Sequence, residues 1–381
     1  MNLKQFLKRQ WADAYLMHAN STHNSDMYYA TRFLAGDAFT YLNSGQEVMM
    51  VSSMEKGRAK KESRVVDVRS SSDYGLKEES KAHKDGGEAY CRVLARLLKN
   101  VGCRKVAVPR DFPVFFADCL QQAGLQVTCV KSPIMKKREK KTAPEIQAIT
   151  TAQRACEQAV AGAIEVIRKA EVVNDELIVN GKPLTSEYMR ALIHHSLLDA
   201  GCEAEGTIVA CGPRSADPHW QGQGVLMADQ PIVLDLFPRH ATKRYYCDMS
   251  RTVVRGEPDP RIVDMHQAVL SAQETAFDLI GPGVNGSEVH QAVCDTITDA
   301  GFHVGDEEGF IHSTGHGVGL DVHERPGLGL QDVSLEVGNV VTVEPGLYYR
   351  DVGGVRVEDL VVVTASGCKN LTIFDKNLRI K

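Results

Sequence analysis

The chain has 381 residues, of which 43% are hydrophobic and 24% are charged, and its formal net charge is −5. This length suggests two domains or one large domain, and the composition is typical of a soluble globular enzyme. The mild acidity gives no reason to expect nucleic acid as a partner, and no apolar run approaches the length of a membrane span. The opening residues, MNLKQFLKRQ, lack the apolar core of a secretory signal, so we expect a cytoplasmic protein.

Ten cysteines are scattered along the chain and form no CxxC pair. Several of them, such as Cys211 and Cys247, lie in apolar runs. This usage is typical of reduced, mostly buried thiols in a cytoplasmic protein.

Residues 1–135 have the pattern of an α/β domain of short, mixed elements. Helical patterning covers Leu3 to Leu16, and the stretches MYYATRFLAGDAFTYL and EVMMVSS predict a turn and sheet strands. GGEAYCRVLARLLKNVG predicts an amphipathic helix that ends at Gly102, and KVAVP predicts a buried strand after it. This alternation favours a partly parallel sheet. The domain shows no phosphate-binding glycine loop and no cluster of catalytic residue types.

Residues 136–143 contain the charge run KKREKK. Such a run can be a nucleic-acid patch, but a solvated linker between domains is the favoured interpretation. Pro144 follows and suits the first turn of a long helix from Glu145 to Lys169.

Residues 144–381 alternate between helical and strand patterns. A helix over Ser186–Ala200 is followed by the strand GTIVACG, and helices over Pro260–Ile280 and Ser287–Ala300 precede the later strands. Each half therefore begins with helices and returns to strands. This order fits an internal two-fold pseudo-repeat, although the two halves show no strong sequence similarity.

The stretch Pro231–Thr252 predicts a β-hairpin that carries two carboxylates. The apolar run Pro231–Leu234 leads to Asp235, and a second run, Tyr245–Val254, carries Asp248. Both carboxylates would then point to the same place. The alternative is a surface hairpin with two solvated aspartates.

Three later residues favour a site over a solvated hairpin. His316 lies in the turn GHGVG, Glu344 ends the run NVVTVE, and Glu358 lies within VRVEDLVVVT. A glutamate in a valine-rich strand is costly to bury without a paired cation or a metal. Two aspartates, two glutamates and one histidine form an oxygen-rich ligand set that suits Mn, Co, Fe or Zn. Four carboxylates offset the charge of two divalent ions, so we predict a two-metal centre.

These five residues and their flanking sequences resemble the ligand signature of the pita-bread metallopeptidases, which include methionine aminopeptidase, aminopeptidase P and prolidase. The matching text is CDMSRTVV, GHGVGLDVHERP, TVEPGLY and VRVEDLVVVT, and the resemblance covers most of the chain from about Thr142. YYATRFLAGDAFTYL weakly resembles the N-terminal domain of creatinase, prolidase and aminopeptidase P. The resemblance implies an α/β (α+β) chain, with a creatinase-like domain over 1–135 and a catalytic pita-bread domain with pseudo-two-fold symmetry over 144–381.

One feature of the hairpin differs from the family pattern. Leu236 follows the first aspartate where the family usually has glycine, and the two aspartates are two residues further apart. Because strand faces alternate with period two, an insertion of two residues keeps both carboxylates on one face.

The resemblance also implies roles for individual residues. The metal ligands are Asp235, Asp248, His316, Glu344 and Glu358, which would hold two divalent ions, with Mn favoured and Co, Zn or Fe still open. In the Xaa-Pro branch of the family, histidines resembling His219, His312 and His323 line the substrate site, and Arg356 resembles an active-site arginine. Glu344 would also take a proton from the nucleophile, and His323 or His219 would stabilise the oxyanion. Tyr348 either faces the site or packs within the domain.

The predicted activity is removal of the N-terminal residue from peptides with proline at the second position, by a metal-bridging hydroxide in a homodimeric enzyme. A strict Xaa-Pro dipeptidase (prolidase) is the first alternative. Some prolidases have an arginine four residues after the histidine that matches His323, whereas this chain has Gly327 there. Arg325 and Arg239 are possible substitutes, and the balance favours an open-ended aminopeptidase. Alternatives of another class are a non-catalytic pita-bread binding protein and a creatinase-like hydrolase.

Overall fold

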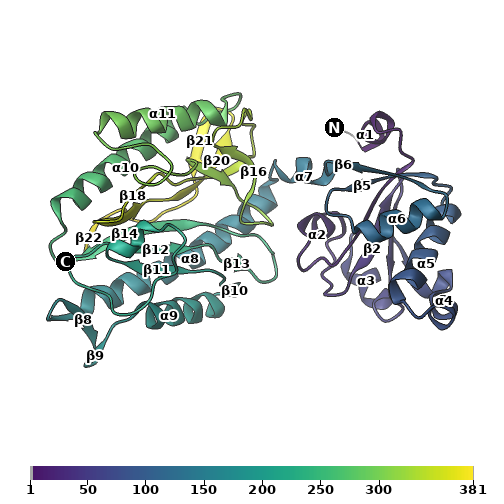
Figure 1. Ribbon diagram of the computed structural model, residues 1–381, viewed down its shortest axis with the longest axis horizontal. Coiled ribbons are helices and arrows are strands. Elements are labelled where there is room, and N and C mark those ends of the chain that lie inside the picture. The colour runs from purple at the N-terminus through teal and green to yellow at the C-terminus, as the bar shows by residue number, and fades with distance from the viewer. Residues whose placement is uncertain (1–2, 381) are drawn as a thin grey trace. The chain divides into compact units, whose positions relative to one another are not determined.

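The computed structural model describes residues 3–380. The chain forms two compact units, residues 1–138 and residues 139–381 (Figure 1). No helix in the described range is long and apolar enough to cross a membrane.

The N-terminal unit is built on one six-stranded sheet with the order β4-β3-β2-β1-β5-β6. β2 is antiparallel to both of its neighbours, and the other adjacent pairs are parallel. The sheet is therefore partly parallel, as the strand–helix alternation predicts. Its strands are β1 Ala14–Ala19, β2 Phe39–Asn43, β3 Glu47–Val51, β4 Asp67–Ser70, β5 Lys105–Pro109 and β6 Gln126–Val130.

Helices cover both faces of this sheet, because successive side chains of each strand point to opposite sides. Tyr15 and Met17 of β1 pack into one core, and Leu16 between them packs into a second core with residues of α5 and α6. The helices are α1 Leu3–Arg9, α2 Ser25–Thr31, α3 Lys56–Glu62, α4 Leu76–Ala82, α5 Gly86–Asn100, α6 Val114–Gln122 and α7 Pro133–Arg138.

Two local predictions in this unit are wrong. The helix predicted over Leu3–Leu16 ends at Arg9, Trp11 adopts a left-handed φ of 53°, and the chain enters the central strand β1 at Ala14. The segment predicted as a turn begins with α2. Its N-terminus is capped by the Asn24 side chain, which accepts a hydrogen bond from the backbone N–H of Met27.

The prediction that all ten cysteines are reduced is wrong for one pair. Cys91 of α5 and Cys119 of α6 form a disulfide, with their Cα atoms 6.4 Å apart. Both helices pack against the same face of the sheet. Packing therefore brings together two positions that are 28 residues apart, without a CxxC spacing that would signal it.

The prediction of a solvated linker over 136–143 is wrong for part of that run. Arg138 ends α7, is buried, and donates from Nη1 to Asp26 Oδ1 at 2.7 Å. Lys141 Nζ lies 3.2 Å from Glu324 Oε2, and the two side chains are 1% and 6% exposed. Buried charges are tolerated when they are paired. The partners lie far away in the sequence, so the charge run itself does not reveal them.

The C-terminal unit contains one arrangement twice: two helices followed by a mainly antiparallel sheet. α8 and α9 precede the sheet β11-β12-β14-β22, and α10 and α11 precede the sheet β16-β15-β17-β20-β21. In Figure 1, α10 and α11 lie on one side of the strands and α9 lies on the other. This is the arrangement expected for the pseudo-two-fold pita-bread fold. The helices are α8 Ala143–Lys169, α9 Ser186–Asp199, α10 Pro260–Leu279 and α11 Gly286–Asp299.

The strands of this unit are short, and several carry site residues at their ends. Small additional sheets join β7 to β8 and β9, β10 to β13, and β18 to β19. The strands are β7 Glu171–Val173, β8 Glu176–Val179, β9 Lys182–Pro183, β10 Cys202–Glu203, β11 Ile208–Cys211, β12 Ile232–Leu236, β13 Arg239–His240, β14 Met249–Arg255, β15 Gly315–Gly317, β16 Glu324–Leu328, β17 Val340–Val343, β18 Gly346–Tyr349, β19 Gly353–Arg356, β20 Asp359–Thr364, β21 Gly367–Asn370 and β22 Arg379–Ile380.

The long helix α8 shows how local sequence positions this unit. Thr142 and Glu145 form a reciprocal capping box, and Pro144 occupies the first turn, where its missing N–H is not needed. The helix then runs uninterrupted to Lys169 and buries an apolar face. On the other side of the fold, buried valines of α10, α11, β17 and β20 form one core beneath the second sheet.

Candidate active site

Asp235 lies on β12 and Asp248 lies directly before its antiparallel neighbour β14, and both aspartates line the same cavity. Asp235 on β12 pairs with Ser250 on β14, and Asp248 comes two residues before Ser250. Positions two residues apart in a strand share a face. The hairpin between the aspartates contains β13 and is longer than the family pattern, yet both carboxylates line one cavity.

The other three predicted ligands lie within or next to strands β15, β17 and β20 of the second sheet. His316 is the central residue of β15, where Gly315 allows a close approach: a Cβ there would lie 2.0 Å from the carbonyl oxygen of Thr342. Glu344 follows β17, and Glu358 lies between β19 and β20. The sequence pattern suggests one continuous strand around Glu358, whereas the structure interrupts that strand at the ligand.

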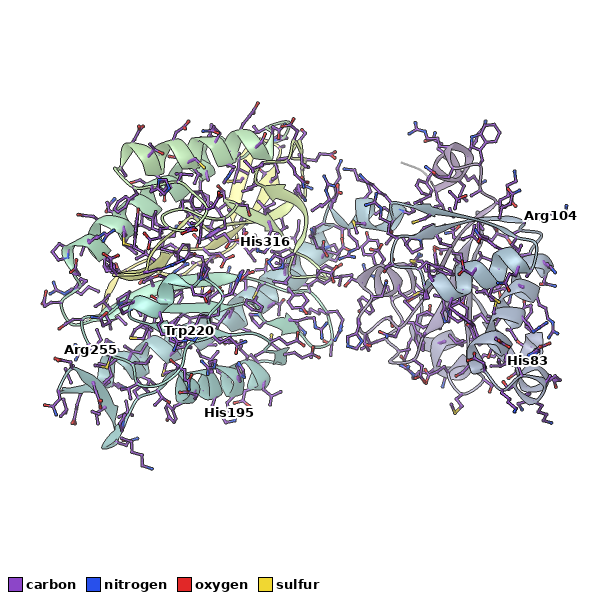
Figure 2. All side chains as sticks on the ribbon, in the orientation of Figure 1. His83, Arg104, His195, Trp220, Arg255 and His316 are labelled. Atoms are coloured by element: carbon purple, nitrogen blue, oxygen red, sulfur yellow. A yellow bond between two sulfur atoms is a disulfide. The ribbon has the colours of Figure 1, made fainter. Side chains whose placement is uncertain are left out.

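These side chains converge from both halves of the unit, and His316 is marked in Figure 2. His316 Nε2 lies 3.2 Å from Glu344 Oε1 and 3.7 Å from Asp248 Oδ2. Asp248, His316 and Glu358 each offer one ligand atom, and these three atoms lie within 4.8 Å of one another. His316 Nδ1 lies 3.2 Å from the carbonyl oxygen of Gly317. A proton on Nδ1 would be donated to that carbonyl, which leaves the Nε2 lone pair for a metal.

The charges of these residues fit a cation centre. Burial and the nearby carboxylates, beginning with Glu358, hold the pKa of Asp248 well above its usual range. Burial, Glu344 and Asp235 do the same to the pKa of Glu358. Burial alone would also raise the pKa of Glu344, but the hydrogen bond with His316 and the charge of that imidazole lower it to about 2.

One buried oxygen gives a direct test of whether a metal fits. Glu358 is 1% exposed, and its Oε1 atom has no hydrogen-bond partner among the described residues. A buried carboxylate oxygen without a partner is costly, and a coordinated ion would satisfy it. The oxygen-rich donor set also matches hard divalent ions. The residues present therefore fit a metal centre.

The predicted substrate-side residues surround the same cavity of about 610 Å³. His219 is exposed at its edge, and the His323 ring lies 4.2 Å from the His316 ring, measured between centroids. The structure brings all nine predicted site residues to this cavity. They are His219, Asp235, Asp248, His312, His316, His323, Glu344, Arg356 and Glu358.

Buried Arg356 and Tyr348 form a hydrogen-bonded row with the cavity residue His312 beside the carboxylates. Arg356 Nη1 donates to the Tyr348 hydroxyl at 2.7 Å, and that hydroxyl lies 3.0 Å from His312 Nε2. His312 Nδ1 lies 2.8 Å from the carbonyl oxygen of Ser313. Burial raises the pKa of Tyr348 to about 12 and lowers the pKa of His312. A neutral His312 that donates from Nδ1 and accepts the tyrosine proton at Nε2 satisfies every atom of this row.

These hydrogen bonds show that Tyr348 packs within the domain, and they limit what His312 can do. Tyr348 is 1% exposed and does not line the cavity, although it contacts two residues that do. Both ring nitrogens of His312 are engaged inside the protein, so its ring carbons are what a substrate would contact. Arg356 Nη2 donates to Asp235 Oδ2 at 2.7 Å, so this arginine orients a predicted metal ligand.

Ser250 is a site residue that sequence reasoning missed. Its hydroxyl lies 2.6 Å from Asp235 Oδ1, 2.9 Å from Glu358 Oε2 and 2.8 Å from Arg356 Nε. It therefore links predicted ligands from the two halves of the unit. Its place two residues after Asp248, on the same strand face, is the signal that could have identified it.

A second missed group lies behind the ligands, away from the cavity. Gln273 of α10 is fully buried, and its Nε2 donates to the carbonyls of Val343 at 2.9 Å and Val357 at 3.1 Å. Each of these carbonyls belongs to the residue before a glutamate that is a predicted ligand. Lys376 Nζ donates to Gln273 Oε1 at 2.5 Å and lies 2.9 Å from Asp359 Oδ2. A polar residue at a core position of an amphipathic helix is the sequence signal for this group.

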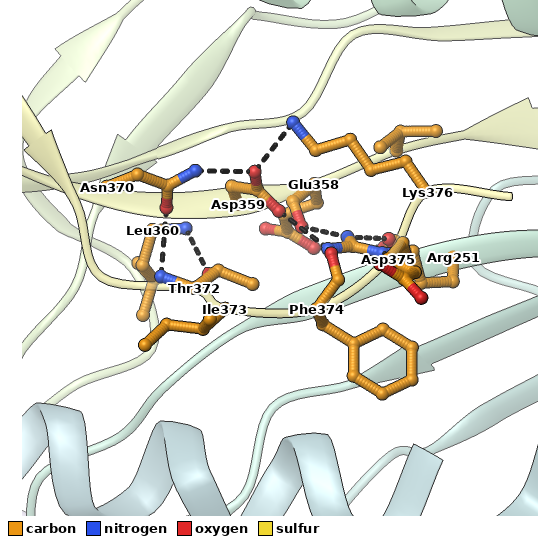
Figure 3. A network of polar contacts seen from close by, with 12 residues as sticks. Arg251, Glu358, Asp359, Leu360, Asn370, Thr372, Ile373, Phe374, Asp375 and Lys376 are labelled. Carbon is orange, nitrogen blue, oxygen red and sulfur yellow. Dashed lines mark hydrogen bonds and ion pairs between the residues drawn. The ribbon is translucent and has the colours of Figure 1, made fainter. Parts of the chain in front are cut away.

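Figure 3 shows the polar contacts that join Arg251 to Glu358, Asp359 and the segment near the C-terminus. Arg251 Nη1 donates to the backbone carbonyls of Ser250 and Glu358, at 2.8 and 2.6 Å, and Nη2 donates to Asp359 Oδ1 at 2.8 Å. The same guanidinium also reaches the carbonyls of Phe374 and Asp375. The strand ends that carry Asp248 and Glu358 are thus joined through one side chain.

Comparison with known proteins agrees with this geometry. Residues 147–365, more than half of the chain, match the sequence profile of Metallopeptidase family M24. The chain belongs to this family. The M24 match takes in every predicted ligand and every predicted substrate-side residue.

The similar M24 proteins include named peptidases. A Xaa-Pro dipeptidase of Pyrococcus furiosus is 35% identical over 224 residues, which make up 56% of this chain and 63% of that protein. The chain thus spans less than two thirds of the length of the first curated relatives it matches. Among solved structures, a Xaa-Pro dipeptidase from Bacillus anthracis superposes with a TM-score of 0.84 and 26% identity, covering 100% of this chain and 98% of the other. The prolidase from Pyrococcus horikoshii OT3 gives 0.80 and 27%, covering 98% and 97%.

Proposed function

We propose that this M24 protein is an exopeptidase that removes the N-terminal residue from peptides with proline at the second position. The observation that carries the proposal is the convergence of four carboxylates, three of them buried, and His316 on a cavity that is also lined by three further histidines. The resemblance to proteins named Xaa-Pro dipeptidase supports the substrate class. Full retention of the ligand set argues against a non-catalytic binding protein or a creatinase-like hydrolase.

The ligands proposed for two divalent ions are Asp235, Asp248, His316, Glu344 and Glu358. When bound, such ions polarise the scissile carbonyl and lower the pKa of a coordinated water. Mn is the favoured ion for this site, and Co, Zn and Fe also suit this set of donor atoms.

The side chains around the ligands have separable tasks. An Xaa-Pro bond is a tertiary amide, so its nitrogen must gain a proton before it can leave. Glu344 can take a proton from the attacking water and deliver it to that nitrogen. His323 and His219 line the cavity without ring hydrogen bonds to other described residues, and they are placed to donate to the developing oxyanion. Arg356 and Ser250 hold the Asp235 carboxylate in place.

The cavity favours an open-ended aminopeptidase over a strict dipeptidase. A dipeptidase needs a cation for the free carboxylate of its substrate. Arg239 is bound to Glu203 at 2.9 Å, and Arg325 lines a neighbouring cavity. Among the described lining residues, Arg356 is the single arginine or lysine, and it is engaged with Asp235.

The N-terminal unit is proposed to shape substrate access or to support a homodimer in the cytoplasm, and to supply no metal ligand. The cluster of possible metal ligands among the described residues lies wholly in the C-terminal unit.

The direct test is hydrolysis of Ala-Pro and Ala-Pro-Ala by the full chain, after chelation and after addition of Mn, Co or Zn. We expect chelation to abolish activity, a divalent ion to restore it, and Ala-Pro-Ala to be cleaved at least as well as Ala-Pro. Activity in metal-free protein would overturn the proposal. A strong preference for Ala-Pro would instead identify a strict dipeptidase.

A further inference from the structure

The cavity lined by the predicted metal ligands is called the metal cavity below. A second cavity of about 760 Å³ adjoins it in the C-terminal unit. The two cavities share Ile311, His312, Ser313 and His316 as lining residues. A chain that leaves the metal cavity past His312 and Ser313 therefore enters the second cavity directly. At about 3.3 Å per extended residue, one or two residues after the proline reach it.

The lining of this second cavity suits a peptide. Gln291 and Gln331 offer amide donors and acceptors, which match the unpaired backbone groups of an extended chain. Phe310 and Val333 supply apolar surface, and Leu330 at the cavity is 90% exposed. Sites of several hundred Å³ with apolar walls and a few polar groups are typical of ligand pockets.

Arg325 is the one arginine or lysine among the described residues that line the second cavity. Its side chain is 46% exposed, and its Nε lies 4.0 Å from Glu139 Oε1, which is a long contact for an ion pair. Two carboxylates also line this cavity. Asp306 is exposed, whereas the Glu324 carboxylate is buried and paired with Lys141 at 3.2 Å, and it also accepts from the backbone N–H of Asp321 at 3.0 Å. The guanidinium therefore remains available to an anion that enters from the metal cavity.

We propose that this second cavity binds the part of the substrate that follows the proline, and that Arg325 binds the C-terminal carboxylate of a tripeptide. The inference rests on the Xaa-Pro activity proposed above and deepens it, because it specifies the preferred peptide length. Arg325 is thus a residue that determines specificity for tripeptides, and it does not clamp a dipeptide.

The test compares two substrates that differ only in the terminal charge, Ala-Pro-Ala and Ala-Pro-Ala amide, with metal-loaded full-length protein. Removal of a charge-assisted hydrogen bond lowers binding by roughly tenfold. We therefore expect the acid-to-amide ratio of kcat/KM to fall about tenfold in Arg325→Gln. Arg350→Gln is the matched control, because Arg350 is exposed and lines neither cavity. In that control the ratio should match the wild type.

An exposed position gives a second measurement that does not depend on folding. Leu330→Glu should lower the acid-to-amide ratio, and Leu330→Lys should raise it, because each places a charge at the second cavity. An unchanged ratio in Arg325→Gln and in both Leu330 variants overturns this inference while leaving Xaa-Pro hydrolysis in place. Failure of the wild type to cleave any Xaa-Pro peptide overturns the proposed function as well.

Discussion

Replacement of Gln273 by leucine tests how the protein holds in position the two glutamates that are proposed as metal ligands. The carboxamide of Gln273 donates to the carbonyls of Val343 and Val357 and accepts from Lys376. Leucine has a similar size but no polar atoms, so the two buried carbonyls would lose a donor and the ammonium an acceptor. Each buried group left unsatisfied costs about 1–3 kcal/mol. Because the chain can relax partly, we expect the free energy of unfolding of the metal-free protein to fall by about 2–4 kcal/mol.

The effect on metal binding should be larger than a loss of stability alone would give. The two carbonyls directly precede the glutamates proposed as ligands, and changes to groups that orient metal ligands weaken affinity by about 10–100-fold. The assay is competition with a chelator of known affinity at a temperature where the variant is fully folded, alongside urea unfolding of the metal-free form. Gln267→Leu on the same helix is the control, because Gln267 is exposed. Wild-type metal affinity in folded Gln273→Leu would refute the reasoning.

Two further predictions concern the metals and pH. Glu358→Ala should lose metal together with activity, whereas His323→Ala should keep both ions and lose mainly kcat, as measured by metal analysis and steady-state kinetics. Burial lowers the pKa of His18 to about 4, so the unfolded chain binds a proton more readily between about pH 6.5 and pH 4. We expect up to about 3 kcal/mol of stability, present above pH 6.5, to be lost as pH falls to 4. A His18→Asn variant should flatten this pH dependence in urea unfolding, and an unchanged slope would contradict it.

The parts of the site that could be predicted from sequence are those governed by local periodicity. Strand alternation places Asp235 and Asp248 on one face despite the longer hairpin, and the apolar surroundings of Glu358 indicate that it needs a cation. Both arguments need only neighbouring residues. Helices followed by strands occur twice in the sequence of the C-terminal unit, which likewise predicts two structural repeats. In each repeat the apolar face of the sheet must be covered by another element.

The parts that could not be predicted depend on partners far away in the sequence. Arg239 was a candidate to bind a substrate carboxylate, but β13 pairs with β10 and brings it to Glu203. The pairing of Cys91 with Cys119 depends on how two helices pack on the sheet. The helix predicted from Leu3 to Leu16 also ends early, because residues from Ala14 onward pair with β2 and β5 instead. Tertiary pairing decides each of these cases.

The buried charges before α8 determine where the C-terminal unit can be separated from the rest of the chain. A sequence-based boundary near Thr142 would remove Lys141, whose ammonium lies 3.2 Å from Glu324 and whose side chain is buried like that of its partner. Loss of one partner of a buried ion pair costs about 3–5 kcal/mol. It would also remove Glu139, whose carbonyl accepts a hydrogen bond from buried Asn339 at 2.8 Å.

We therefore expect a fragment that starts at Glu139 to fold and bind two divalent ions, and a fragment that starts at Thr142 to be less stable by at least about 3 kcal/mol. Urea unfolding and metal analysis of both fragments provide the comparison. A Lys141→Met substitution in the longer fragment separates the loss of this charge from the loss of backbone contacts. Equal stability of the two fragments would show that the ion pair contributes little. Loss of metal from a folded fragment starting at Glu139 would show instead that the N-terminal unit takes part in the metal site.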